Sequence, residues 1–134
     1  MPFLLWSDLL SVGVESIDDE HKQLIAIVND LYQAHCEGHE KEVVGEIIER
    51  LRKYIRIHFA REERLMERCD YPGLAEHKLE HTAMEKWVAV MENEYRAGNG
   101  AEIAHEIFDY LKDWFYDHIG RIDQLYAPYL KNSA

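Results

Sequence analysis

Two residue pairs with helical spacing flank a turn signal in the middle of this 134-residue chain. The pairs are His58 with Glu62 and His77 with His81, and the sequence between them includes DYPG at residues 70–73. Residues four apart on a helix lie on one face, so each pair points toward a common site. The DYPG sequence is typical of a turn. This stretch therefore predicts a helical hairpin with four metal-ligand side chains meeting at one end.

Apolar residues recur every three or four positions in four segments, as on the buried faces of helices in a bundle. The expected helices cover residues 16–37, 40–68, 72–97 and 101–119. Ser16 is the expected cap of the first helix, Pro72 opens the third, and Gly120 interrupts the fourth. Short connections between four such helices favour an all-α fold, an antiparallel up-down-up-down four-helix bundle. We expect an N-terminal arm, a short C-terminal helix and a single domain over residues 1–134.

The composition limits the partners and the location that we expect. The formal net charge of -11 argues against nucleic-acid binding and against docking on anionic membranes. No apolar run approaches the roughly 18 residues that a membrane span needs, so we expect no membrane insertion. The two cysteines, Cys36 and Cys69, fall at opposite ends of the predicted bundle and are expected as free thiols. These features favour a cytoplasmic protein.

Seven potential metal ligands fall at one end of the predicted bundle. In an antiparallel bundle the first and third helices start where the second and fourth helices end. A single histidine on an apolar helix face is more often an ordinary core residue than a ligand. Burying seven polar groups without a metal, however, would leave many unpaired at a cost of about 1–3 kcal/mol each. The candidate metal ligands are His21, His58, Glu62, His77, His81, His118 and Asp123.

Seven ligands are too many for one ion, whereas two ions can share bridging carboxylates. Imidazole suits iron, zinc and copper. If Glu62 and Asp123 both bridge, together with an oxo or hydroxo group, the five histidines divide three and two, and one ion keeps an open position. A structural zinc site is a further alternative. His118 and Asp123 are five residues apart, about 140° around a regular helix, so the helix must be deformed, and Gly120 allows a break or a bulge there.

The whole pattern resembles the hemerythrin family, and within it the single-domain bacteriohemerythrins. The motifs are His21, HFARE at residues 58–62, HKLEH at residues 77–81 and HIGRID at residues 118–123. The neighbouring sequences SVGVESIDDEH, HFAREERLM and YPGLAEHKLEH are similar too, and the resemblance covers nearly the whole chain. One departure is Glu20, where many relatives carry Gln.

The resemblance implies two iron ions (Fe2+/Fe3+) joined by an oxo or hydroxo bridge. It also implies a role for each ligand. His77, His81 and His118 would hold a six-coordinate iron, and Glu62 and Asp123 would bridge. His21 and His58 would hold the five-coordinate iron that takes O2.

The function that the resemblance implies is reversible O2 binding for transport, storage, delivery or sensing, without enzymatic activity. The alternative is a di-iron oxidase or peroxidase-type enzyme on the same scaffold. Five neutral imidazoles among seven ligands favour the carrier. The expected ligand is O2, with an O2-consuming client or a signalling protein as further candidate partners. Four apolar side chains near the ligands are candidates for an O2 pocket, although ordinary core packing is the favoured explanation for each one alone: Ile25, Ile55, Trp114 and Phe115.

The remaining histidines are predicted to lie outside the site. His35 and His39 fall near the end of the first helix, at the opposite end of the bundle. Glu102 and His105 form a Glu-x-x-His pair, as in ferritin-like di-iron sites, but the pair lies at the start of the fourth helix. No second pair of this kind occurs in the sequence, so His105 is not expected to bind metal.

Overall fold

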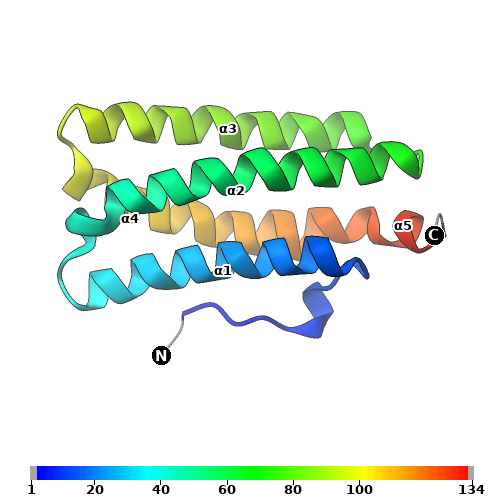
Figure 1. The fold of residues 1–134 in the computed structure, drawn as a ribbon, viewed down its shortest axis with the longest axis horizontal. Coiled ribbons are helices and arrows are strands. Elements are labelled where there is room, and N and C mark those ends of the chain that lie inside the picture. The colour runs from blue at the N-terminus through cyan, green and yellow to red at the C-terminus, as the bar shows by residue number, and fades with distance from the viewer. Residues whose placement is uncertain (1–2, 133–134) are drawn as a thin grey trace.

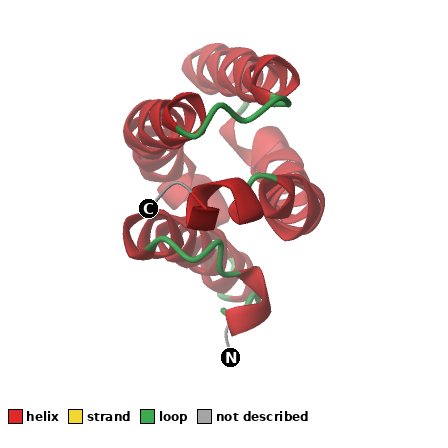
Figure 2. Ribbon diagram, turned by 90° about the vertical axis from the view of Figure 1, so that its right-hand side faces the viewer, coloured by secondary structure: helices red, strands yellow, loops and turns green. Residues whose placement is uncertain are grey.

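Four long helices form the body of the protein and run alternately in opposite directions (Figure 1). The computed structural model describes residues 3–132. The helices are α1 (Glu15–Cys36), α2 (Glu40–Arg68), α3 (Leu74–Arg96) and α4 (Gly100–Asp113). Figure 2 looks onto the end of the bundle where α1 starts, and the C-terminal segment crosses the middle of that end. The predicted all-α, up-down-up-down four-helix bundle is confirmed.

The fourth helix does not stop at Gly120, and the predicted interruption there is wrong. The chain continues from α4 as a π-helix, η2 (Trp114–Ile122). A short 3-10 turn, η3 (Asp123–Leu125), and a short helix, α5 (Ala127–Asn132), follow. A π-helix closes each turn with a hydrogen bond between residues five apart instead of four. Of the two deformations expected between His118 and Asp123, a break or a bulge, the structure therefore has the bulge, as a widened helix.

Two predicted helix starts also differ from the structure. Helix α1 begins one residue before Ser16, so this serine lies inside the first turn and caps nothing. The Asp18 carboxylate instead accepts hydrogen bonds from the Ser11 hydroxyl and from the backbone N–H of Val12. These bonds join the segment before α1 to its first turn. Pro72 lies in the turn before α3, which begins at Leu74.

The N-terminal arm lies along the outside of α1, with a short 3-10 turn, η1 (Asp8–Leu10), near its end (Figure 1). The Asn29 side chain of α1 holds the arm by three hydrogen bonds. Its Oδ1 accepts from the backbone N–H groups of Phe3 and Leu4, at 2.9 and 2.7 Å, and its amide donates to the Leu4 carbonyl at 2.9 Å. The arm is thus an ordered part of the fold, as predicted.

Two groups of buried apolar side chains fill the bundle. The candidate metal ligands contact both groups, His81 through Phe59 and Glu62 through Tyr126. The larger group extends along all four helices and includes Phe59 and Trp114. A smaller group, which we call the end cluster, closes the end where α1 starts. The end cluster consists of Val12, Ile17, Met66, Tyr126, Ala127 and Leu130.

Cys36 and Cys69 are both free thiols, as expected. Among the described residues, no helix combines the length and the apolar composition that crossing a membrane requires.

Candidate metal centre

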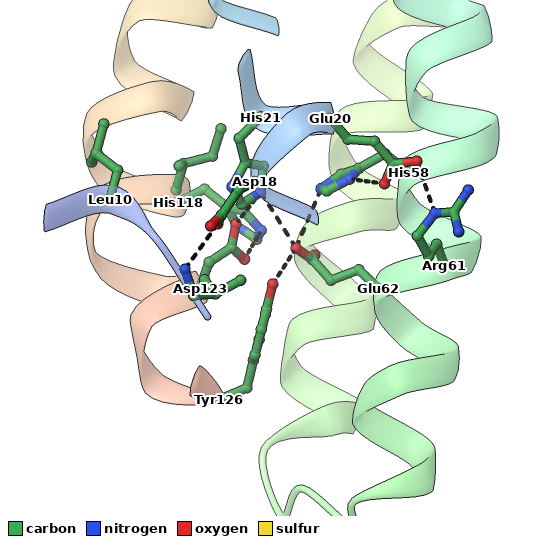
Figure 3. A network of polar contacts seen from close by, with 12 residues as sticks. Leu10, Asp18, Glu20, His21, His58, Arg61, Glu62, His118, Asp123 and Tyr126 are labelled. Atoms are coloured by element: carbon green, nitrogen blue, oxygen red, sulfur yellow. Dashed lines mark hydrogen bonds and ion pairs between the residues drawn. The ribbon is translucent and has the colours of Figure 1, made fainter. Parts of the chain in front are cut away.

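All seven candidate ligands lie in one cluster inside the bundle, and each residue is at most 2% exposed. Five elements of the fold supply the seven side chains. His21 comes from the first turns of α1, His58 and Glu62 from the last turns of α2, and His77 and His81 from the first turns of α3. His118 lies on η2, and Asp123 starts η3. Figure 3 labels His21, His58, Glu62, His118 and Asp123, which point toward one another from α1, α2 and the C-terminal segment.

Glu62 lies at the centre of the cluster, and its two carboxylate oxygens face different histidines. Oε1 lies 3.1 Å from Nε2 of His77 and 2.8 Å from Nε2 of His81. Oε2 lies 3.2 Å from Nε2 of His58 and 3.5 Å from Nε2 of His21. One carboxylate therefore connects histidines on three different helices.

Asp123 connects the two sides in the same way. Its Oδ1 lies 3.0 Å from Nε2 of both His77 and His118, and its Oδ2 lies 3.1 Å from Nε2 of His21. Two sets of closely spaced ligand atoms result, with Glu62 common to both. One set contains His77, His81 and His118 beside Glu62, and the other contains His21 and His58 beside Glu62.

The π-helix explains how His118 and Asp123 reach the same point. The backbone N–H of Asp123 donates to the carbonyl of His118, a bond between residues five apart. Residues joined in this way lie one helical turn apart on the same face. On a regular α-helix, Asp123 would point about 140° away from His118.

Three of the five histidines are held by a glutamate at the ring nitrogen that faces away from the cluster. Nδ1 of His58 lies 2.9 Å from Glu20, which also accepts from Arg61 at 2.9 Å (Figure 3). Nδ1 of His81 lies 2.7 Å from Glu63, and Nδ1 of His118 lies 3.2 Å from Glu80. A carboxylate at Nδ1 keeps the proton on that nitrogen and leaves the Nε2 lone pair free for a metal.

Sequence reasoning missed Glu63 and Glu80 as partners of the histidines, because each acts on a histidine of another helix. It also missed two buried tyrosines. The Tyr126 hydroxyl donates to Oε2 of Glu62 at 2.7 Å. Tyr54 stacks on His58, with ring centroids 5.0 Å apart, and its buried hydroxyl has no hydrogen-bond partner. The spacing of residues 54, 58 and 62 along one helix face was the signal for Tyr54.

The candidate O2-pocket residues are all buried in the larger apolar group: Ile25, Ile55, Trp114 and Phe115. Trp114 stacks on His118 at 3.9 Å between ring centroids and lies 6.4 Å from His81. It thus belongs to the side of the cluster with three histidines. Phe59 also stacks on the His81 ring, at 3.8 Å between centroids, and lies 5.8 Å from Trp114. His105 lies near the start of α4, about three turns before His118, and its Nε2 lies 3.1 Å from Asp109 on its own helix.

The unpaired polar atoms of the cluster test whether a metal fits. The buried atoms without a hydrogen-bond partner include Nε2 of His21, His81 and His118 and both carboxylate oxygens of Asp123. Nε2 of His21 and Nε2 of His118 lie 3.1 and 3.0 Å from the two oxygens of Asp123, but not with the alignment of a hydrogen bond. The lone pairs converge on the space between the side chains. Imidazole and carboxylate together are a donor set suited to iron, so two metal ions would satisfy these atoms.

Without a metal, the carboxylates of Glu62 and Asp123 favour the protonated form of the neighbouring histidines. Burial lowers the pKa of His21 and His77, but the nearby carboxylates of Asp123 and Glu62 outweigh it, since their oxygens face the Nε2 atoms of both rings. The pKa of His21 rises to about 10 and that of His77 to about 9. Burial and the charge of Glu62 raise the pKa of Asp123, but His118 and His21 outweigh them and hold it below its usual value.

These shifts predict how the stability of the metal-free protein depends on pH. An imidazole with a raised pKa in the folded state stabilises fully below pH 6.5, the unfolded value. This contribution is lost as pH rises through about 9 and 10. We expect the free energy of unfolding, measured with urea, to fall between pH 6.5 and about 10. The iron-loaded protein should change much less, because a metal replaces the proton on Nε2. Equal stability of the metal-free protein at both pH values would contradict this.

Comparisons with known proteins agree with a metal centre at this position. The sequence profile of the hemerythrin HHE cation binding domain matches residues 12–130. A bacteriohemerythrin of Stenotrophomonas maltophilia is 37% identical over 131 residues, which cover 98% of this chain and 84% of that protein. A bacteriohemerythrin of Methylococcus capsulatus is 30% identical over 131 residues, which cover 97% of this chain and 98% of that protein. The crystal structure of a wild-type hemerythrin superposes with a TM-score of 0.85, at 30% identity, over 98% of this chain and 99% of the other.

Proposed function

The chain belongs to the hemerythrin family, which binds O2 reversibly at a non-haem di-iron centre, and we propose that the seven buried side chains hold its two irons. The observation that carries this proposal is the convergence of unpaired nitrogen and oxygen atoms on one space. His77, His81 and His118 hold one iron, and His21 and His58 hold the other. Glu62 and Asp123 bind both, since each lies within 3.5 Å of histidines from both sets.

Two irons held by these residues would supply the electrons that O2 needs when it binds and would take them back when it leaves. His21 and His58 provide fewer protein ligands than His77, His81 and His118, so their side of the cluster would leave room for O2. The protein's own contribution is to fix the ligands and to exclude water. Glu20, Glu63 and Glu80 hold the protons of three histidines, and the Tyr126 hydroxyl fixes Glu62 from the end cluster. A rigid, dry site favours the release of O2 over its loss as peroxide, because proton transfer to O2 needs a donor.

The donor set supports a carrier and not an enzyme. Five of the seven proposed ligands are neutral imidazoles, whereas di-iron enzymes that oxidise substrates rely on more carboxylates to stabilise highly charged iron. The groove between α2 and α3 that reaches Ile55 and Phe59 has glutamates, arginines and a lysine around an apolar floor.

We also propose a compartment, a domain organisation and a partner for the protein. The free thiols of Cys36 and Cys69 support a reducing compartment, the cytoplasm. We take the whole chain of 134 residues as one domain, since the family profile spans residues 12–130 and the arm is bonded to α1. The O2 is delivered to an O2-consuming client or sensed through a signalling protein.

A spectroscopic experiment on matched variants tests the function. On exposure to O2, the reduced iron-loaded protein should gain a charge-transfer absorption band from bound peroxide to iron. The band should vanish when O2 is removed. His58→Ala should lose the band, because it removes a ligand of the iron with the open position. His105→Ala, an exposed histidine outside the cluster, should keep it. Irreversible bleaching with turnover of a substrate would instead favour the oxidase or peroxidase alternative.

A further inference from the structure

A row of stacked aromatic rings leads from His118 to the surface between α3 and α4. The Trp114 indole stacks on the His118 ring, with centroids 3.9 Å apart and planes 13° from parallel. Tyr110 lies 6.5 Å from Trp114 at 14°, and Trp87 of α3 stacks on Tyr110 at 3.8 Å and 7°. His118 and Trp114 are buried, whereas Tyr110 and Trp87 are partly exposed. We call Trp114, Tyr110 and Trp87 the aromatic relay.

The kind of ring in the relay distinguishes it from ordinary core packing. Indole and phenol rings lose an electron far more readily than the ring of Phe. Phe59 packs on His81 as closely as Trp114 packs on His118, but it offers no such electron. Tyr54 stacks on His58 but is itself buried. The aromatic relay therefore combines oxidisable rings, near-parallel stacking and a path from a proposed iron ligand to solvent.

The proposed function itself supplies an oxidant that such a path would serve. When O2 leaves as hydrogen peroxide, it takes two electrons from the irons and two protons from water, and a ferric pair remains. Reduction of the peroxide to two water molecules requires two more electrons and two more protons. A pair that is already ferric leaves these electrons to be drawn from the protein. The nearest oxidisable ring to His118 is Trp114, whose plane lies against it.

We propose that the aromatic relay passes electrons from thiols at the surface to the metal centre and so protects the iron ligands from oxidation by peroxide. Trp114 loses an electron first and is reduced by Tyr110. Tyr110 is then reduced by Trp87. Tyr110 releases its phenolic proton with its electron and regains it when it is reduced. Two thiols each lose one electron and one proton and join as a disulfide. In total, one peroxide and two thiols become two waters and one disulfide.

The surface beside the relay indicates the charge of the thiol. Tyr110, Trp114 and His118 line a surface hollow of about 320 Å³, together with the carboxylates of Glu80, Asp113 and Asp117. Three acidic groups around the exposed edge of the relay attract cations and repel anions. A cationic thiol such as cysteamine should therefore reduce the relay faster than the anionic thiol mercaptoacetate at the same concentration.

The test follows where oxidation accumulates. The iron-loaded protein, first oxidised to the ferric state, is treated with hydrogen peroxide without thiol, and oxidised residues are located by peptide mass spectrometry. In the unchanged protein, oxidation should reach Tyr110 and Trp87, and radicals of these rings should appear in freeze-quenched EPR spectra. In Tyr110→Phe, oxidation of Trp87 should fall to the level of the metal-free protein. In Trp87→Phe, oxidation should accumulate at Tyr110.

Trp6→Phe is the matched control, because Trp6 lies in the N-terminal arm against Lys22 and outside the relay. This variant should oxidise like the unchanged protein. Equal oxidation of Trp87 in Tyr110→Phe, or in the metal-free protein, would overturn the relay. The relay rests on the proposed function, so iron content and the O2 spectrum are measured on the same preparation. A protein without iron overturns both, whereas one that binds O2 but shows no effect of Tyr110→Phe overturns the relay alone.

Discussion

Replacing Glu62 by Gln is expected to leave a folded protein that holds at most one iron per chain and no longer binds O2. Each carboxylate oxygen of Glu62 faces its own pair of histidines, at distances between 2.8 and 3.5 Å. In Gln one of these oxygens becomes an amide NH2, which donates hydrogen bonds and has no lone pair for a metal. Glu and Gln have similar helix propensity, so α2 should persist.

Glu67→Gln provides the matched control for this change. Glu67 lies on the same helix but is exposed and outside the cluster, so its replacement should leave both irons and the O2 spectrum intact. Iron per chain by elemental analysis and the oxygen-dependent absorption band are the measurements. Two irons and a normal O2 band in Glu67→Gln, with neither in Glu62→Gln, is the expected pattern. A Glu62→Gln protein that keeps both would show that this carboxylate does not join the two irons.

Inserting one alanine after Gly120 is expected to remove Asp123 from the metal centre and to abolish binding of the iron pair. The π-helix already accommodates five residues in the turn from His118 to Asp123, as their backbone bond shows. A sixth residue has no regular helical turn available to it, because helices close at three, four or five residues. Asp123 would then rotate away from His21, His77 and His118, which it now approaches at 3.0–3.1 Å.

Deleting Gly120 is the informative counterpart. Deletion leaves His118 and Asp123 four residues apart, and an α-helix places such residues on one face. We therefore expect the deletion variant to retain more iron than the insertion variant, with circular dichroism confirming that both stay helical. Equal iron loss in the two variants would mean that the width of this turn does not position Asp123.

The helices and the meeting of the seven polar groups followed from sequence because both depend on spacing within single helices. The pairs at residues 58 and 62 and at residues 77 and 81 fix two helix faces without knowledge of any neighbour. Antiparallel packing then brings His21 and His118 to the same end. The helix starts were less accurate, since Ser16 looks like a cap in sequence while Asp18 bonds the preceding segment instead.

The glutamates that hold His81 and His118 could not be predicted, because each one acts from another helix. Glu63 reaches His81 from α2, and Glu80 reaches His118 from α3. Neither spacing nor residue type sets these glutamates apart from the many others in an acidic sequence. The π-helix was predictable only as a requirement, because no residue in its sequence favours it over a break at Gly120.

The C-terminal segment closes the end of the bundle, so the rate at which this segment opens limits the rate of iron loss. Gln124 donates to the Leu10 carbonyl at 2.9 Å, and Tyr126 packs in the end cluster with Val12 from the segment before α1. His118 and Asp123 lie in the same C-terminal segment as Gln124 and Tyr126. A local opening of this segment withdraws two ligands and admits water in one step. A chelator therefore removes iron no faster than this segment opens, however strong the chelator is.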